Sequence, residues 1–138
     1  MGQLFPIEKL KPQIGTFTCS VGDCSIELPL AQFELDGTTV NTSIHLEGIL
    51  LPSVKLDELI GNRYDFPINP EPGHIDGSIY IEHAHHPVDI TVIEFGERQE
   101  ELFSIKIELC LILEYDGLGG YIDTDATLEG LIRPKRAM

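Results

Sequence analysis

Apolar and polar side chains alternate along residues 103–115, and this is the clearest pattern in the chain. Every odd position is apolar or aromatic, while the even positions include Lys106 and Glu108. A period of two over this length is typical of a β-strand and does not fit a helix. At about 3.4 Å per residue the segment would extend about 44 Å, so it must bend, carry a bulge or cross the whole sheet. Such a strand is expected at the sheet centre or at a dimer seam, because an uncovered apolar edge would aggregate.

The same alternation recurs in shorter segments, which turn-forming residues separate. The predicted strands are Gly15–Ser20, Cys24–Leu28, Ala31–Leu35, Val40–Leu46, Gly77–Glu82, Val88–Phe95, Phe103–Tyr115 and Ile122–Ile132. One short helix is predicted over Val54–Ile60, with Ser53 as its N-cap and Gly61 at its end. A length of 138 residues fits a single domain spanning residues 1–138. We therefore expect a mainly β protein, a single antiparallel β-sandwich or jelly-roll-like domain with one short helix.

The charge of the chain is strongly negative and unevenly distributed. The formal net charge is −14, and residues 12–132 hold 22 acids against four bases, a balance of −18. Such a field repels nucleic acid and anionic membranes, and it accelerates encounters with basic partners. Asp123, Asp125 and Glu129 would project from one face of the last predicted strand, so they are the candidate binding residues. The alternative is a solvated acidic surface that keeps the protein soluble.

The cysteines and the N-terminal sequence bear on the cellular compartment. Three cysteines, an odd number, suit reduced thiols in the cytoplasm better than a disulfide framework. The first residues carry no secretory signal pattern, and the longest apolar run, residues 109–113, is too short to span a bilayer. Cys19 and Cys24 flank a predicted hairpin loop and would face each other across two strands. We expect two small apolar residues there, with a regulatory disulfide or a pair of metal ligands as alternatives.

The greatest density of chemically reactive side chains lies between Gly77 and Gly96. Three histidines and one aspartate fall within seven residues: His83, His85, His86 and Asp89. Alternation would place His83 and His85 on the same face as Ile79 and Ile81, and His86 on the opposite face. Two imidazoles at positions i and i+2 of a strand lie about 7 Å apart at Cα, close enough to share one metal ion.

The spacing of this segment resembles the first motif of the cupin family. That motif is a glycine, five residues, His-any-His, three or four residues, a glutamate, six residues and a glycine. The matching positions here are Gly77, His83, His85, Asp89 and Gly96. The resemblance implies a metal-binding jelly roll in which His83, His85 and Asp89 hold a divalent metal ion. Asp89 replaces the family's glutamate, and no histidine follows His86 to match the family's second motif. The alternative is a surface loop, His85-His86-Pro87, between two strands, with histidines that are solvated or lie at a binding edge.

Three classes of function follow from these features. The charge favours a non-enzymatic cytoplasmic binding protein that engages a basic protein partner, for example a bacterial toxin-neutralising (immunity) protein, with no cofactor. The first alternative is a small cupin-like metal-binding protein or metal-dependent enzyme that uses His83, His85 and Asp89. The second alternative is a structural subunit of a β-rich homo-oligomer, such as a homodimer, whose long strands pair between chains. Catalysis has no strong candidate residues, because the serines lack a nucleophile elbow and no phosphate-binding loop occurs.

Overall fold

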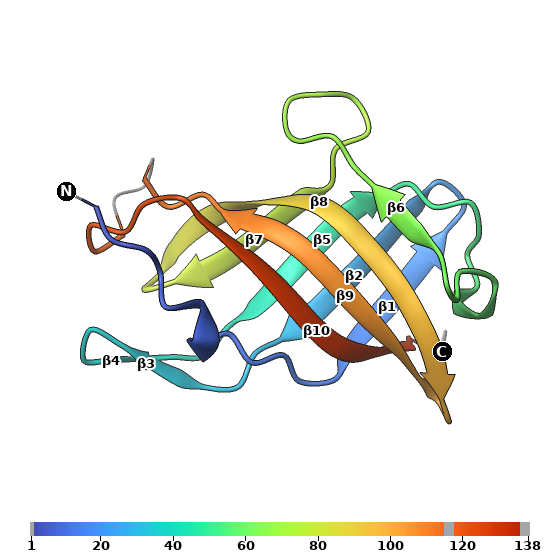
Figure 1. Ribbon diagram of the computed structural model, residues 1–138, viewed down its shortest axis with the longest axis horizontal. Coiled ribbons are helices and arrows are strands. Elements are labelled where there is room, and N and C mark those ends of the chain that lie inside the picture. The colour runs from blue at the N-terminus through green and yellow to red at the C-terminus, as the bar shows by residue number, and fades with distance from the viewer. Residues whose placement is uncertain (1, 115–117, 136–138) are drawn as a thin grey trace.

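Seven strands close into a barrel in the computed structural model, which describes residues 2–114 and 118–135 (Figure 1). The strands follow one another around the barrel in the order β8-β7-β5-β2-β1-β10-β9, and β9 pairs with β8 to complete the circle. Their bounds are β1 Gly15–Ser20, β2 Asp23–Pro29, β5 Ser43–Ile49, β7 Asp76–Ile81, β8 Ala84–Gln99, β9 Leu102–Leu111 and β10 Thr124–Pro134. A further short strand, β6 (Arg63–Asp65), pairs with β8 outside this circle.

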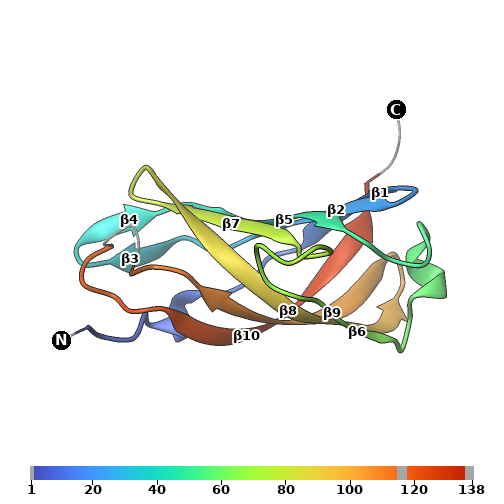
Figure 2. The same cartoon turned by 90° about the horizontal axis from the view of Figure 1, so that it is seen from above.

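The closed barrel confirms the mainly β prediction but differs from the predicted sandwich or jelly roll. The strand β8 is responsible for the closure, because its first part pairs with β7 and its longer second part pairs with β9. Figure 2 shows β8 passing from one side of the barrel to the other. The pairs around the barrel are antiparallel except between β1 and β10, which run parallel over Gly15–Phe17 and Ile132–Pro134. The predicted antiparallel arrangement is therefore wrong at this one seam.

Aliphatic side chains that alternate along the strands fill the barrel. In β9 the buried residues are Phe103, Ile105, Ile107, Leu109 and Leu111, as the alternation predicts. The strand β9 lies between β8 and β10, so the prediction that it is a central strand is confirmed. Fully burying one such side chain contributes about 1.5–3 kcal/mol. Tyr115, at the end of the predicted strand, lies outside the described residues.

A short 3₁₀ turn takes the place of the one predicted helix, and a second 3₁₀ turn lies near the N-terminus. They are η1 (Ile7–Lys9) and η2 (Leu56–Glu58), and η2 lies inside the predicted helix Val54–Ile60. The Oγ of Ser53 accepts a hydrogen bond from the backbone N–H of Lys55 at 3.1 Å, just before η2. A segment this short forms too few hydrogen bonds to offset the cost of helix nucleation, which explains why the turn does not extend into an α-helix.

A separate hairpin packs over one end of the barrel (Figure 1). It consists of β3 (Phe33–Leu35) and β4 (Thr38–Val40), so the predicted strand Val40–Leu46 is divided between β4 and β5. Phe33 packs edge-on against the buried Phe5, which also contacts Tyr121 with ring centroids 5.4 Å apart. The hydroxyl of Tyr121 donates a hydrogen bond to Asp36 Oδ2 at 3.1 Å. These contacts close this end with an aromatic cluster.

Candidate functional site

The histidine-rich segment turns at Glu82 and His83, and His85, His86 and Pro87 belong to β8 rather than to a surface loop between two strands. Glu82 and His83 have φ values of 53° and 67°, as in a two-residue hairpin turn, and the chain reverses there between β7 and β8. The cross-strand pairs that result are Ile81–Ala84, Tyr80–His85 and Ile79–His86. His86 therefore shares the inward face of Ile79 and is fully buried, while His85 points outward and is exposed. The predicted assignment of these histidines to the two faces is wrong.

The residues of the cupin-like motif do not form a three-ligand site. His83 is exposed in the turn, and His85 and Asp89 are four residues apart on the outer face of β8, which is about 13 Å along a strand. Among residues 2–114 and 118–135, no group of three or more His, Cys, Asp and Glu side chains could hold a metal ion. The structure thus adds no geometric support to His83, His85 and Asp89 as ligands. The expectation that no cofactor is bound stays a prediction.

Cys19 and Cys24 are joined by a disulfide in the β1–β2 hairpin. They lie directly opposite each other, with their Cα atoms 4.0 Å apart. The predicted cross-strand position is confirmed, but the expectation of two free thiols is wrong. Cys110 is the free cysteine of the described chain. Because disulfides persist mainly in oxidising compartments, the cysteines no longer favour the cytoplasm, and a cytoplasmic location stays a prediction.

Outward side chains in the middle parts of β8, β9 and β10 form one continuous surface, which we call the acidic face; the exposed Arg98 and Arg133, near the ends of β8 and β10, lie outside it. Its residues are Asp89, Thr91, Glu94, Lys106, Glu108, Cys110, Asp125, Thr127 and Glu129. The strand register arranges six of them in two rows across the sheet, Asp89–Cys110–Asp125 and Glu94–Lys106–Glu129. Neighbouring strands lie about 4.8 Å apart, so side chains within a row are adjacent. The acidic face thus combines five carboxylates with one ammonium group.

The basic side chains at the acidic face are already paired. The Nζ of Lys106 lies 4.0 Å from Glu94 Oε2, and Arg63 Nη1, on the neighbouring β6, lies 3.7 Å from Glu108 Oε2. Such partly exposed pairs contribute about 0–1 kcal/mol each. The ion pairs of the described residues do not include Asp89, Asp125 or Glu129. The face therefore keeps an excess of negative charge that nearby cations do not balance.

The three binding residues predicted from the sequence have different surroundings. The Oδ1 of Asp123 accepts hydrogen bonds from the backbone N–H groups of Leu113 at 2.8 Å and Glu114 at 3.1 Å. This carboxylate therefore holds the segment that follows β9. Asp125 and Glu129 are exposed and belong to the acidic face. Asp123 therefore supports the local backbone, and the role of Asp125 and Glu129 as binding residues stays a prediction.

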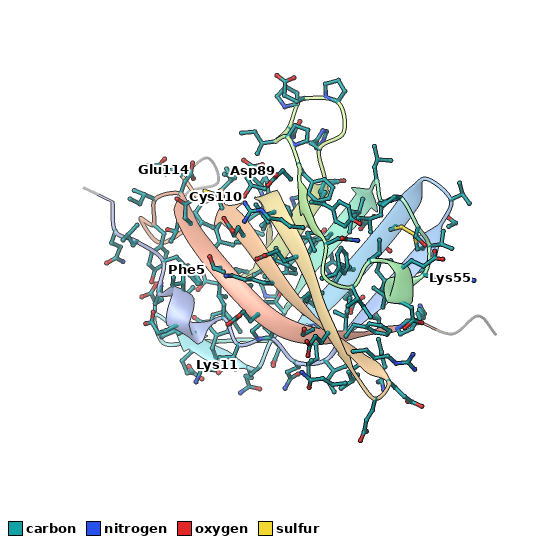
Figure 3. All side chains as sticks on the ribbon, turned by 45° about the vertical axis from the view of Figure 1, so that its right-hand side comes forward. Phe5, Lys11, Lys55, Asp89, Cys110 and Glu114 are labelled. Atoms are coloured by element: carbon teal, nitrogen blue, oxygen red, sulfur yellow. A yellow bond between two sulfur atoms is a disulfide. The ribbon has the colours of Figure 1, made fainter. Side chains whose placement is uncertain are left out.

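The carboxylates change the titration of their neighbours. Burial raises the pKa of Cys110 from 9.0 to about 12, and a hydrogen bond to Asp125 and the charges of Asp125, Asp123 and Asp89 add to the shift. Burial, followed by the charge of Asp123, also raises the pKa of Asp89, whereas His74 lowers it. Both upward shifts have the sign expected near other negative charges. Figure 3 shows Asp89 and Cys110 together at one end of the barrel.

Two open hollows lie along the acidic face. One has a volume of about 500 Å³ and is lined by Ile7, Thr91, Glu108, Leu109, Cys110, Asp125, Ala126 and Thr127. The other, of about 430 Å³, includes Glu94, Gly96, Ser104, Lys106, Glu129 and Gly130 in its lining. A Cβ on Gly96 would lie 2.1 Å from Ser104 Oγ, so a larger residue there would require the Ser104 side chain to move. The face is therefore grooved, with carboxylates lining both hollows.

Sequence reasoning missed most of this surface. It identified acids on β10, considered Asp89 only as a metal ligand, and did not single out Glu94 or Glu108. The alternation along β9 does predict that Lys106 and Glu108 point outward, so the sequence indicates the direction of these side chains. Their assembly into rows depends on pairings between residues far apart in sequence, which a single strand pattern does not contain.

Comparisons of the chain with protein-family models, curated proteins and solved structures gave no match. In the part of the chain that the structure describes, no helix is long and apolar enough to cross a membrane. Evidence about the function therefore comes from the fold and the surface of this chain.

Proposed function

We propose that this protein is a non-enzymatic binding protein whose acidic face engages a basic protein partner. The observation that carries the proposal is the pair of cross-strand rows, in which carboxylates sit on both outer strands of a three-stranded surface. Strands in a closed barrel hold these groups at fixed spacing, so a partner meets a preorganised surface. Lysine and arginine side chains are the groups that form charge-assisted hydrogen bonds with such carboxylates.

Electrostatic repulsion within the acidic face favours a cationic partner. Asp89 and Asp125 flank Cys110, and the raised pKa values of Asp89 and Cys110 are caused first by burial and then by the surrounding negative charge. Like charges at this spacing raise the free energy of the unbound protein, and a bound cation relieves that repulsion. Neutralising a cationic toxin is one role that needs carboxylates and no catalytic group. A cytoplasmic location is part of this proposal.

The test compares two double variants that remove the same charge from opposite sides of the barrel. Asp125→Asn with Glu129→Gln changes the acidic face, whereas Glu27→Gln with Glu47→Gln changes exposed residues of β2 and β5. Each protein is used as bait in extracts of the source organism, and a captured basic protein is purified for stopped-flow association measurements. Thermal unfolding verifies that both variants are folded.

The acidic-face variant should associate about tenfold more slowly than wild type, while the control variant should lose much less. The wild-type association rate should also fall steeply between low and physiological salt. Equal losses in the two variants would show that net charge matters and the face does not. An empty capture at low salt would also count against the proposal.

A further inference from the structure

The β7–β8 turn lies close to β4 (Figure 2). Residues of the turn, of β4 and of β7 line a separate hollow. It has a volume of about 680 Å³ and is lined by Thr38, Thr39, Val40, Asn41, Tyr80, Glu82 and His83. None of these residues belongs to the acidic face. The hollow therefore presents a second chemical environment, with an aromatic ring, hydroxyl groups, an amide, an imidazole and a carboxylate.

The aromatic ring in this hollow, that of Tyr80, is restrained by a neighbouring ring and is exposed to solvent. Tyr80 points outward from β7 and is 54% exposed. Its ring packs edge-on against His85 on β8, with centroids 5.1 Å apart and an interplanar angle of 72°. The buried side chain of Val40 provides an apolar element of the lining. A restrained, exposed aromatic face is a surface on which cations bind through the electron-rich ring.

The charge at this end of the barrel is negative. Glu82 is the carboxylate of the lining, which contains no Lys or Arg. Asp36, in the adjoining β3–β4 turn, accepts a hydrogen bond from Tyr121. Burial, this bond and the charges of Asp36 and Glu82 together raise the pKa of Tyr121, so both carboxylates act on the same corner. A positively charged ligand is favoured there over an anion.

The turn itself keeps side chains where glycine would be less strained. Glu82 and His83 both occupy the left-handed region of φ, which costs a non-glycine residue about 1–2 kcal/mol. Asn and Gly are the usual residues of such turns, and neither is present here. The turn thus places a carboxylate and an imidazole at the hollow, although Asn and Gly would adopt this backbone conformation with less strain.

We propose that this hollow binds a small organic cation, with the carbon atoms around its ammonium group on the Tyr80 ring and its charge facing Glu82. Free methylated amines and the side chain of a lysine share this chemistry. The hydroxyl and amide groups of Thr38, Thr39 and Asn41 are available to a polar end of the ligand. The site lies apart from the acidic face and does not depend on its function.

The test is a titration of the full chain with small ligands, and binding is measured from the backbone amide NMR shifts. The probes are choline, its neutral isostere 3,3-dimethyl-1-butanol, and a lysine with both backbone ends blocked. At least one ammonium probe should give saturable shifts at residues 38–41 and 80–85, with a Kd on the order of millimolar. Choline binding alone assigns the site to free cations, and binding of the blocked lysine assigns it to a peptide side chain. The neutral isostere should bind at least about tenfold more weakly than choline where choline binds.

Two pairs of variants measure separately how much the Tyr80 ring and the Glu82 charge contribute to binding. Tyr80→Phe should bind within about twofold of wild type, because the aromatic face remains, while Tyr80→Leu should lose about tenfold. Glu82→Gln should weaken binding severalfold, and Glu47→Gln, at the far end of the β5–β7 pair, should leave it unchanged. Absence of saturable shifts with both ammonium probes would overturn the proposal. Equal affinity for the neutral isostere, or full binding by Tyr80→Leu, would do the same.

Discussion

Neutralising Asp125 should make the Cys110 thiol more acidic and faster to alkylate. The two residues are cross-strand neighbours on β9 and β10. Burial is the largest cause of the raised pKa of Cys110, and the hydrogen bond and charge of Asp125 are the next two. Asp125→Asn keeps the size of the side chain and removes its charge. The pKa should therefore fall while staying above that of a solvated thiol, because burial remains.

The size of the effect follows from the fraction of thiolate. A pKa of about 12 instead of 9.0 lowers the thiolate fraction at pH 8 by about 1,000-fold. Each pKa unit recovered raises that fraction about tenfold, but a less basic thiolate is also less nucleophilic, which offsets roughly half of the logarithmic gain. If Asp125→Asn lowers the pKa by about one unit, alkylation should become about threefold faster.

The assay is iodoacetamide labelling followed by intact mass, without reductant so that the Cys19–Cys24 disulfide stays closed. Glu129→Gln is the matched control, since it removes the same charge from β10 but lies opposite Lys106 rather than Cys110. In urea all three proteins should react at one rate. If folded Asp125→Asn reacts no faster than wild type, the carboxylate does not influence the thiol. The electrostatic support for the acidic face would then be lost.

Three other changes test the core, the titration of the acidic face and the disulfide. Leu109→Asp should lower the free energy of unfolding in urea by about 4 kcal/mol or more, because it buries an unpaired charge at a residue only 3% exposed; Val21→Asp, at a residue 93% exposed, should change little. Folded Asp89 has a raised pKa, so its ionisation costs stability as the pH rises from 3.8 through that raised value. Asp89→Asn should therefore have a higher Tm than wild type at pH 7 and a similar Tm well below pH 3.8; an unchanged Tm at pH 7 would contradict this. Protein isolated in air should titrate as one free thiol, and as three after reduction and unfolding; replacing Cys19 and Cys24 by serine should cost about 2 kcal/mol, because the closed loop is short.

The strands were predictable because their period of two reflects burial on one side. The predicted segment Gly15–Ser20 matches β1, and the buried positions of β9 are those that the alternation gives. The acids of β10 were also predictable as outward residues. Strand positions and the direction of their side chains follow from the order of apolar and polar residues within one segment, so the sequence of that segment predicts them.

The closure of the barrel and the histidine turn were not predictable in the same way. Barrel closure requires β8 to pair with two different strands along its length and β1 to meet β10 in parallel, which are long-range choices. The turn at Glu82–His83 lacks the Asn-Gly or Asp-Gly signal of a two-residue hairpin, so the sequence pattern does not reveal the reversal there. A two-residue reversal inverts the relation between position and face, and this moved His86 into the core.

The closed barrel narrows the ways in which this chain can recognise another molecule. Inward residues of β8 and β9, such as Ile93 and Leu111, are fully buried, so the interior is packed with the chain's own side chains. The strand β9 is paired on both edges, so it offers no backbone to the second chain of a strand-paired oligomer. Recognition by the strands of the barrel circle then uses their outward side chains. On the acidic face five of the nine are carboxylates. Their mutual repulsion raises the free energy of the unbound protein, and this is the physical reason to expect a cationic partner.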